Sequence, residues 1–216
     1  MIVYRTIIFD LDETLVHTKP EFKVQVIKNT LDYLGIVSRY SMEDIERFWF
    51  GPDRNGTIER CFRTKPGNFW SAYARISEAT LTTDYIEPYD DIRFLGTMKK
   101  DGYKMGVLTE NSQKNAELET EVISKRIGCN PFDLVLSPYS NGFKPKPHPE
   151  CLQECLRRLG ADHDTAMFVG NGPEDVDVAR NAGVMDCFIE RGGHMFIIDP
   201  PPSISIKSLY ELEQYL

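Results

Sequence analysis

Two carboxylates separated by one residue follow an apolar stretch near the start of the chain. Asp10 and Asp12 come directly after residues 4–9, whose β-branched and aromatic side chains are typical of a strand buried on both faces. Side chains alternate along extended backbone, so both carboxylates would point the same way and repel each other. A shared proton or a hard cation such as Mg²⁺ would compensate. The stretch therefore predicts a metal-assisted site at a strand end, where open α/β sheets bind ligands.

The elements that would position these residues alternate between strands and helices. The sequence predicts five buried strands, over residues 4–9, 103–109, 133–137, 165–169 and 186–190. Helices are predicted between and after them, over residues 92–100, 111–126, 150–159, 176–182 and 208–216. Such alternation implies right-handed crossovers and a mostly parallel, Rossmann-like sheet covered on both faces, a three-layer α/β sandwich.

Residues 18–87 have a helical sequence pattern without the buried-strand pattern found in the rest of the chain. Helical periodicity is present over residues 22–34, and Ser41 with Asp44 indicates the start of a second helix. No stretch there predicts a buried strand, so we interpret residues 18–87 as a helical insertion into a core domain of residues 1–17 and 88–216. One cluster of its aromatic residues is expected mainly to pack in the core of the insertion; this cluster is Trp49, Phe50, Phe69, Trp70 and Tyr73.

Composition narrows the class of protein. The 216 residues carry a net charge of −8, which argues against a general nucleic-acid or anionic-membrane binder. An anionic substrate would need local compensation by a metal or a few well-placed cations. The five cysteines are odd in number and form no Cys-x-x-Cys pair, as expected for reduced thiols in the cytoplasm. We find no signal peptide and no apolar run long enough to span a membrane, so a cytoplasmic protein is expected.

The segment over residues 10–14, Asp-Leu-Asp-Glu-Thr, resembles the first signature of the haloacid dehalogenase (HAD) superfamily. That signature is a hydrophobic strand followed by Asp-x-Asp-x-Thr. The resemblance implies that Asp10 is a nucleophile that becomes an aspartyl-phosphate and that Asp12 is the general acid/base. Three further signatures should then follow in order, each at the end of a later strand.

The second and third signatures are a lone hydroxyl residue and a lysine before Pro-x-Pro. Thr109 closes a predicted strand and matches the second, although Glu110 follows it where many relatives have Asn. Lys144 and Lys146 both fit the third. We favour Lys146, because Pro149 then opens a helix and the spacing to the fourth signature suits one helix and one strand. Either lysine would supply positive charge to a phosphoryl group.

The fourth signature, Gly-Asp-x-x-x-Asp, resembles residues 170–175. Asp175 falls on the second acidic position, but Asn171 occupies the first, where family members usually supply a metal carboxylate. An amide oxygen ligates Mg²⁺ without adding charge, so weaker metal binding is expected unless Glu174 substitutes.

Together the signatures cover the core and imply a C1-capped HAD phosphatase. The implied activity is Mg²⁺-dependent hydrolysis of a small phosphomonoester metabolite through an aspartyl-phosphate. Asp12 argues against dehalogenation, which does not need it. A phosphomutase and a catalytically weakened binding or regulatory protein remain alternatives, and the oligomeric state is left open. The implied catalytic residues are Asp10, Asp12, Thr109 and Lys146, and the implied metal ligands are Asp10, Asp12 through its carbonyl, Asn171 and Asp175.

Overall fold

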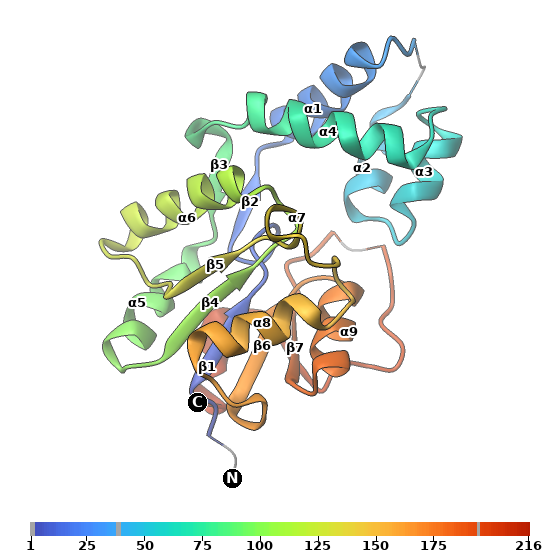
Figure 1. Cartoon of the computed structure of the whole chain (residues 1–216). Coiled ribbons are helices and arrows are strands. Elements are labelled where there is room, and N and C mark those ends of the chain that lie inside the picture. Colours follow the sequence, from blue (N-terminus) through green and yellow to red (C-terminus); the bar gives the residue numbers. More distant parts are fainter. Residues whose placement is uncertain (1–2, 38–39, 194) are drawn as a thin grey trace. The chain divides into compact units, whose positions relative to one another are not determined.

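The computed structural model describes residues 3–37, 40–193 and 195–216. It divides into two compact units, coloured along the chain in Figure 1. The first unit contains the chain up to His17, Ile86–Arg191 and Ile198–Leu216, and the second contains Thr18–Tyr85 and Gly192–Ile197. The interpretation of residues 18–87 as a cap stays a prediction.

The first unit is built on a six-stranded sheet in the order β5-β4-β1-β6-β7-β8, and the neighbouring strands pair in parallel. The strands are β1 (Thr6–Phe9), β4 (Lys104–Leu108), β5 (Leu134–Leu136), β6 (Ala166–Gly170), β7 (Met185–Ile189) and β8 (Ile204–Ile206). This confirms the predicted mostly parallel α/β sheet. The prediction of five strands was wrong by one: β8 has only three residues, too few to show a periodic pattern.

The register of the central strands determines which residues meet at the sheet edge. Phe9 of β1 lies opposite Val107 of β4 and Val169 of β6. The residues that follow these three strands therefore emerge together at the carboxyl edge, at the point where the strand order reverses.

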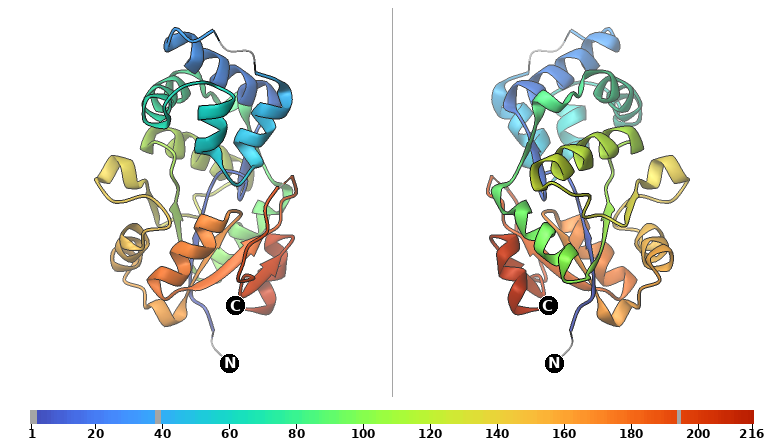
Figure 2. Two further views of the ribbon diagram at one scale, coloured as in Figure 1. Left: turned by 90° about the vertical axis from the view of Figure 1, so that its right-hand side faces the viewer. Right: turned by 90° about the vertical axis from the view of Figure 1, so that its left-hand side faces the viewer.

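Helices cover both faces of this sheet (Figure 2). On one face, α8 (Glu150–Leu159) and α9 (Pro173–Ala182) bury apolar side chains against Ile8 and Phe168. On the other lie α5 (Arg93–Lys100) and the C-terminal segment, and α6 (Gln113–Ile127) packs on α5 and β5. The predicted α-helix over residues 208–216 is instead a 3₁₀ helix, η4 (Leu209–Gln214), which begins at a Ser208 cap.

Short elements complete the first unit. They are the strand β3 (Ile86–Pro88), the first two residues of β2 (Val16–Thr18), the 3₁₀ helices η2 (Asp90–Ile92) and η3 (His163–Thr165), and the one-turn helix α7 (Pro138–Asn141). The sequence predicted neither the β2–β3 pair nor α7. Within the described residues, we find no helix with the length and hydropathy to cross a bilayer.

The second unit is helical around an aromatic core. Its helices are α1 (Pro20–Tyr33), α2 (Met42–Phe50), α3 (Arg54–Arg60), α4 (Pro66–Thr80) and the 3₁₀ helix η1 (Thr83–Tyr85). Ser41 and Asp44 form the capping box expected at the start of α2. The Phe48 ring lies 5.4 Å from that of Phe69 and 5.7 Å from that of Phe62, and all three side chains are fully buried. The predicted packing is present for Trp49, Phe69, Trp70 and Tyr73, whose rings contact Phe48, whereas the Phe50 ring lies 4.5 Å from Lys23 Nζ.

Candidate active site

The loop after β1 places the two leading carboxylates at the carboxyl edge of the sheet. The Asp10 amide donates to the Val169 carbonyl at 2.8 Å, which continues the pairing of β1 with β6 by one residue. Glu13 then adopts a left-handed conformation with φ of 55°, and its amide donates to the Val16 carbonyl at 2.7 Å. This tight turn follows the two aspartates, and a non-glycine residue in that conformation interrupts extended backbone there.

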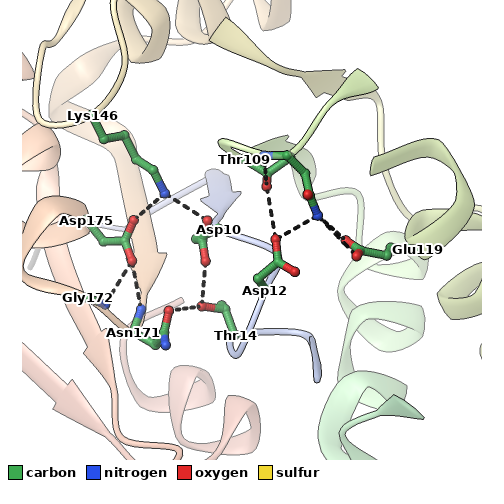
Figure 3. Close-up of polar contacts among 10 residues, drawn as sticks. Asp10, Asp12, Thr14, Thr109, Glu119, Lys146, Asn171, Gly172 and Asp175 are labelled. Atoms are coloured by element: carbon green, nitrogen blue, oxygen red, sulfur yellow. Dashed lines mark hydrogen bonds and ion pairs between the residues drawn. The ribbon is translucent and has the colours of Figure 1, made fainter. Parts of the chain in front are cut away.

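An ammonium group joins two of the expected site carboxylates (Figure 3). Lys146 Nζ donates to Asp10 Oδ1 at 2.8 Å and to Asp175 Oδ1 at 2.6 Å. The three side chains are nearly buried, with exposed fractions of 4% for Lys146, 10% for Asp10 and 3% for Asp175. The structure thus brings together one residue from each of three sequence signatures, although they lie up to 165 positions apart in the chain (175 minus 10).

Burial and charge act in opposite directions on this triad. Burial raises the pKa of Asp10 well above its ordinary value, Lys146 partly offsets that rise, and the nearby Asp175 and Asp12 add to it. Burial alone would lower the pKa of Lys146, but the charges of Asp10 and Asp175 outweigh it and raise that pKa. The lysine therefore stays charged, while Asp10 needs further positive charge to ionise fully.

Asp175 also shapes the loop between β6 and α9. Its Oδ2 accepts the backbone N–H groups of Asn171 at 3.0 Å and Gly172 at 2.9 Å, which caps α9. A Cβ at Gly170 would lie 2.4 Å from the Asp175 carboxyl carbon, so only glycine permits this approach. Both Asp175 carboxylate oxygens therefore accept hydrogen bonds, one from Lys146 and one from the loop between β6 and α9. That Asp175 also ligates a metal stays a prediction.

Asp10 and Asn171 offer the oxygens that best fit a hard cation. Thr14 Oγ1 lies 3.1 Å from Asp10 Oδ2 and 3.1 Å from Asn171 Oδ1. A hydroxyl has one proton and can donate to only one of these acceptors at a time. The carboxylates of Asp10 and Asp175 also share a single ammonium, that of Lys146. A divalent cation held by Asp10 and Asn171 would bind the acceptor oxygen that Thr14 leaves without a proton. It would also add the positive charge that the carboxylates lack.

Asp12 lies on the other side of the loop, among neutral donors. Asn111 Nδ2 donates to Asp12 Oδ2 at 2.9 Å, and Thr109 Oγ1 lies 3.5 Å from the same oxygen. Thr109 is buried directly after β4, as the sequence predicted, and its hydroxyl oxygen also accepts the Asn111 N–H at 3.1 Å. Thr109 thereby links the end of β4 to the residue that holds Asp12.

Sequence reasoning did not find Asn111 and Glu119. Asn111 Nδ2 also donates to the Glu119 carboxylate, at 3.1 and 3.2 Å, and Glu119 is fully buried on α6. Burial, followed by the charge of Asp12, raises the pKa of Glu119 well above its ordinary value, and the Asn111 hydrogen bond partly opposes the rise. One signal existed: Glu119 lies at helical spacing with Ala116 and Ile123, on the inward stripe of α6.

Arg191 lies two residues after β7 and binds the backbone of the aspartate loop. Its guanidinium donates twice to the Thr14 carbonyl, at 3.0 and 2.8 Å, and forms a two-pronged pair with Asp91 at 2.7 and 3.0 Å. The Tyr89 ring lies 4.1 Å from the guanidinium carbon. These contacts hold the backbone that carries the Thr14 hydroxyl, and no sequence motif predicted them.

The remaining candidates lie apart from these contacts. Lys144 is exposed, with Nζ 3.5 Å from His148 Nε2, and Glu174 folds back over Gly172. Among the described residues, one cluster of three acidic or histidine side chains has the spacing of a metal site, and it is the exposed group Asp162, His163 and Asp164. That cluster precedes β6, at the amino edge of the sheet, opposite Asp10.

Comparison with known proteins agrees with this geometry. The family model for haloacid dehalogenase-like hydrolases matches residues 7–189. A pyrophosphatase PpaX from Bacillus cereus (strain AH820) is 30% identical over 181 residues, covering 82% of this chain and 79% of that protein. The PpaX of Bacillus anthracis (strain A0248) matches with the same identity and coverage.

Solved structures share the fold at lower identity. A predicted phosphoglycolate phosphatase from Haemophilus somnus has a TM-score of 0.74 at 19% identity, covering 98% of this chain and 97% of its own. CbbY from Rhodobacter sphaeroides, solved in complex with phosphate, has a TM-score of 0.72 at 19% identity, with 98% and 97% coverage. The family model spans most of the chain and includes the aspartate loop, Thr109, Lys146 and the β6–α9 loop. This chain belongs to the haloacid dehalogenase-like hydrolase family.

Proposed function

We propose that this enzyme is a Mg²⁺-dependent phosphatase that hydrolyses small phosphorylated metabolites through an aspartyl-phosphate on Asp10. The observation that carries the proposal is the buried contact of Lys146 Nζ with Asp10 Oδ1 and Asp175 Oδ1 at the carboxyl end of the central strand. A nucleophilic carboxylate beside a fixed ammonium, in a family of hydrolases, suits attack on an anionic phosphoryl group.

Two steps follow from the residues. Asp10 attacks phosphorus, forming a carboxylate O–P bond as the bond to the leaving oxygen breaks, and Asp12 gives that oxygen a proton. Water then attacks the aspartyl-phosphate while Asp12 takes its proton, which releases inorganic phosphate and restores Asp10. Lys146 and the Thr109 hydroxyl stabilise the negative charge on the phosphoryl oxygens during both steps.

Asp10 and Asn171 would hold the Mg²⁺, with the Asp12 carbonyl and Asp175 as further candidate ligands. When bound, the ion supplies positive charge against the phosphoryl oxygens and favours the ionised form of Asp10. The neutral amide of Asn171 makes this a site of reduced negative charge, so a modest affinity for Mg²⁺ is expected.

Two substrate classes are supported. Small phosphomonoesters fit the proposed roles of Asp10 and Asp12 directly. Inorganic pyrophosphate is the second candidate, because curated relatives at 30% identity are named pyrophosphatases. A phosphomutase would use the same core residues but transfer the phosphoryl group between positions of a substrate rather than release it.

Phosphate release from p-nitrophenyl phosphate, pyrophosphate and a panel of phosphometabolites tests the proposal. Wild-type protein should release phosphate with Mg²⁺ and lose this activity in excess EDTA. Asp10→Asn, which removes the nucleophile and keeps the shape, should lower the rate by at least about 10⁴-fold. Asp90→Asn is the matched control, because Asp90 is exposed and forms a surface ion pair with Arg126.

The test also separates the alternatives. Full activity of Asp10→Asn, or of the wild type in EDTA, would overturn the mechanism. Absence of both phosphate release and a Mg²⁺-dependent rise in melting temperature would favour a binding or regulatory protein instead.

A further inference from the structure

A buried carboxyl group on α6 has no role in the steps above. The Glu119 side chain is fully buried on the inward stripe of the helix, where its neighbours Ala116 and Ile123 are apolar. Burying a carboxyl group costs free energy unless a specific interaction compensates. The Glu119 carboxyl group accepts hydrogen bonds from the Asn111 side chain, so the explanation for its burial lies there.

The Asn111 amide stands between two carboxylates and uses both of its N–H bonds. Nδ2 donates to Asp12 Oδ2 at 2.9 Å on one side and to the Glu119 carboxyl group at 3.1 and 3.2 Å on the other. If the Asn111 amide were reversed, its oxygen would face the acceptor oxygens of Asp12 and Glu119, and both hydrogen bonds would be lost. The two contacts therefore favour one orientation, in which Asn111 presents an N–H donor to Asp12.

The Asn111 backbone is held as firmly as its side chain. Its N–H donates to Thr109 Oγ1 at 3.1 Å, and its carbonyl accepts the Ser137 hydroxyl at 2.6 Å. With the main chain fixed at both ends, the remaining freedom of Asn111 is rotation about its side-chain bonds. Glu119 is the group that removes this freedom on the side away from Asp12.

We propose that Glu119 is a positioning residue for the general acid/base. Glu119 orients the Asn111 amide, and the amide holds Asp12 Oδ2 so that Asp12 delivers its proton to the leaving oxygen. The inference rests on the proposed function, because it needs Asp12 as the acid. It adds two positioning residues to that function, Asn111 and Glu119, which act through Asp12 without touching the substrate.

A positioning role predicts a dependence on the leaving group that a merely structural role does not. General-acid assistance matters most for a basic leaving group, such as the alkoxide released from glycerol 2-phosphate, and least for p-nitrophenolate. Misplacing Asp12 should therefore slow the alkyl phosphate far more than the aryl phosphate. General damage to the fold would slow both equally.

The experiment compares kcat/KM for both substrates in Glu119→Leu, Glu119→Gln and wild type, at saturating Mg²⁺. Glu119→Leu should lose about 10- to 100-fold with glycerol 2-phosphate, because misaligned catalytic groups cost rates of this order, and less than about 5-fold with p-nitrophenyl phosphate. Glu119→Gln keeps a carbonyl oxygen that accepts from Asn111 Nδ2 and should restore most of the loss. Glu117→Gln, an exposed glutamate on the same helix, is the matched control.

The outcomes separate this inference from the proposed function. Equal losses on the two substrates, or no loss, in Glu119→Leu would overturn the positioning role and leave the phosphatase proposal intact. A wild type that releases no phosphate would overturn both. If Glu119→Leu does not fold, Asn111→Ala provides the same comparison, and it should show the same preference for loss on the alkyl phosphate.

Discussion

The two aspartates that begin the site lie one residue apart and have opposite surroundings. On the Asp10 side, an ammonium joins two carboxylates, because Lys146 Nζ contacts both Asp10 and Asp175. On the Asp12 side, a neutral amide joins two carboxylates, because Asn111 Nδ2 contacts both Asp12 and Glu119. The two bridges differ in the group at their centre, which is a charged ammonium beside Asp10 and a neutral amide beside Asp12.

The difference in charge suits the two roles proposed for the aspartates. A nucleophile has to be ionised, and a fixed ammonium favours the ionised carboxylate even in a buried position. A general acid/base has to gain and lose a proton, and an ammonium in direct contact would oppose its protonation. An amide orients the carboxyl group by hydrogen bonding without adding a full charge. The comparison therefore gives three ways to alter one bridge while leaving the other in place.

Removing the ammonium should have the largest effect. Lys146→Met leaves Asp10 and Asp175 buried without a cation, so the free energy of unfolding should fall by about 3 to 5 kcal/mol. The loss of charge at the phosphoryl group should lower kcat/KM by about 10³-fold. Phosphate release and urea denaturation measure the two effects.

Lys144→Met is the control for this prediction. Lys144 lies two positions earlier, also precedes a proline and is exposed, so its replacement should change neither quantity by more than about twofold or 0.5 kcal/mol. The reverse ranking of the two variants would mean that Lys144 serves the site, and that the arrangement around Asp10 is not the catalytic one.

Adding a carboxylate beside Asp10 should have a smaller effect. It should strengthen Mg²⁺ binding and destabilise the protein when no metal is bound. Asn171→Asp gives a cation a second charged oxygen beside Asp10, so the Mg²⁺ concentration for half-maximal activity should fall about 10-fold. Without metal, the new charge near Asp10 and Asp175 should lower the melting temperature. Titrating Mg²⁺ in activity and melting assays tests both.

Asn68→Asp supplies the matched control, since it adds the same charge at an exposed position at the start of α4. It should not alter the Mg²⁺ requirement. An Asn171→Asp variant with an unchanged Mg²⁺ requirement would show that position 171 does not ligate the metal.

The Asp10 bridge could be anticipated from sequence in a way that the Asp12 bridge could not. Asp10, Thr109 and Asn171 each follow a strand-like run, and a parallel register brings such positions together. Lys146 could be separated from Lys144 because the helix begins at Glu150, as predicted. These inferences work because strand ends and helix starts are local features of the chain.

The Asp12 bridge depends on packing that local features do not determine. Glu119 belongs to a helix rich in polar residues, and its helical spacing with Ala116 and Ile123 does not show that its side chain meets Asn111. The short strands β2, β3 and β8 were missed for a related reason: three residues form a strand only when a neighbour pairs with them. Tertiary contacts select these features among several that the sequence allows.

The smallest expected effect is a pH-dependent change in stability when Glu119, in the Asp12 bridge, is replaced by glutamine. Glu119 has a raised pKa in the fold, so the folded protein keeps a proton that the unfolded chain releases above the ordinary glutamate pKa of 4.5. Stability from this group is therefore full below pH 4.5 and falls by up to about 1.4 kcal/mol per pH unit as the pH rises towards the raised pKa.

The glutamine of Glu119→Gln does not titrate, so this variant should not lose stability in that way as the pH rises. The melting temperature of Glu119→Gln minus that of wild type should thus grow as the pH rises above about 5, whereas Glu117→Gln should show no such trend. A difference that is constant with pH, or that grows towards acid, would mean that Glu119 is ionised in the folded protein and that the Asp12 bridge carries a second full negative charge.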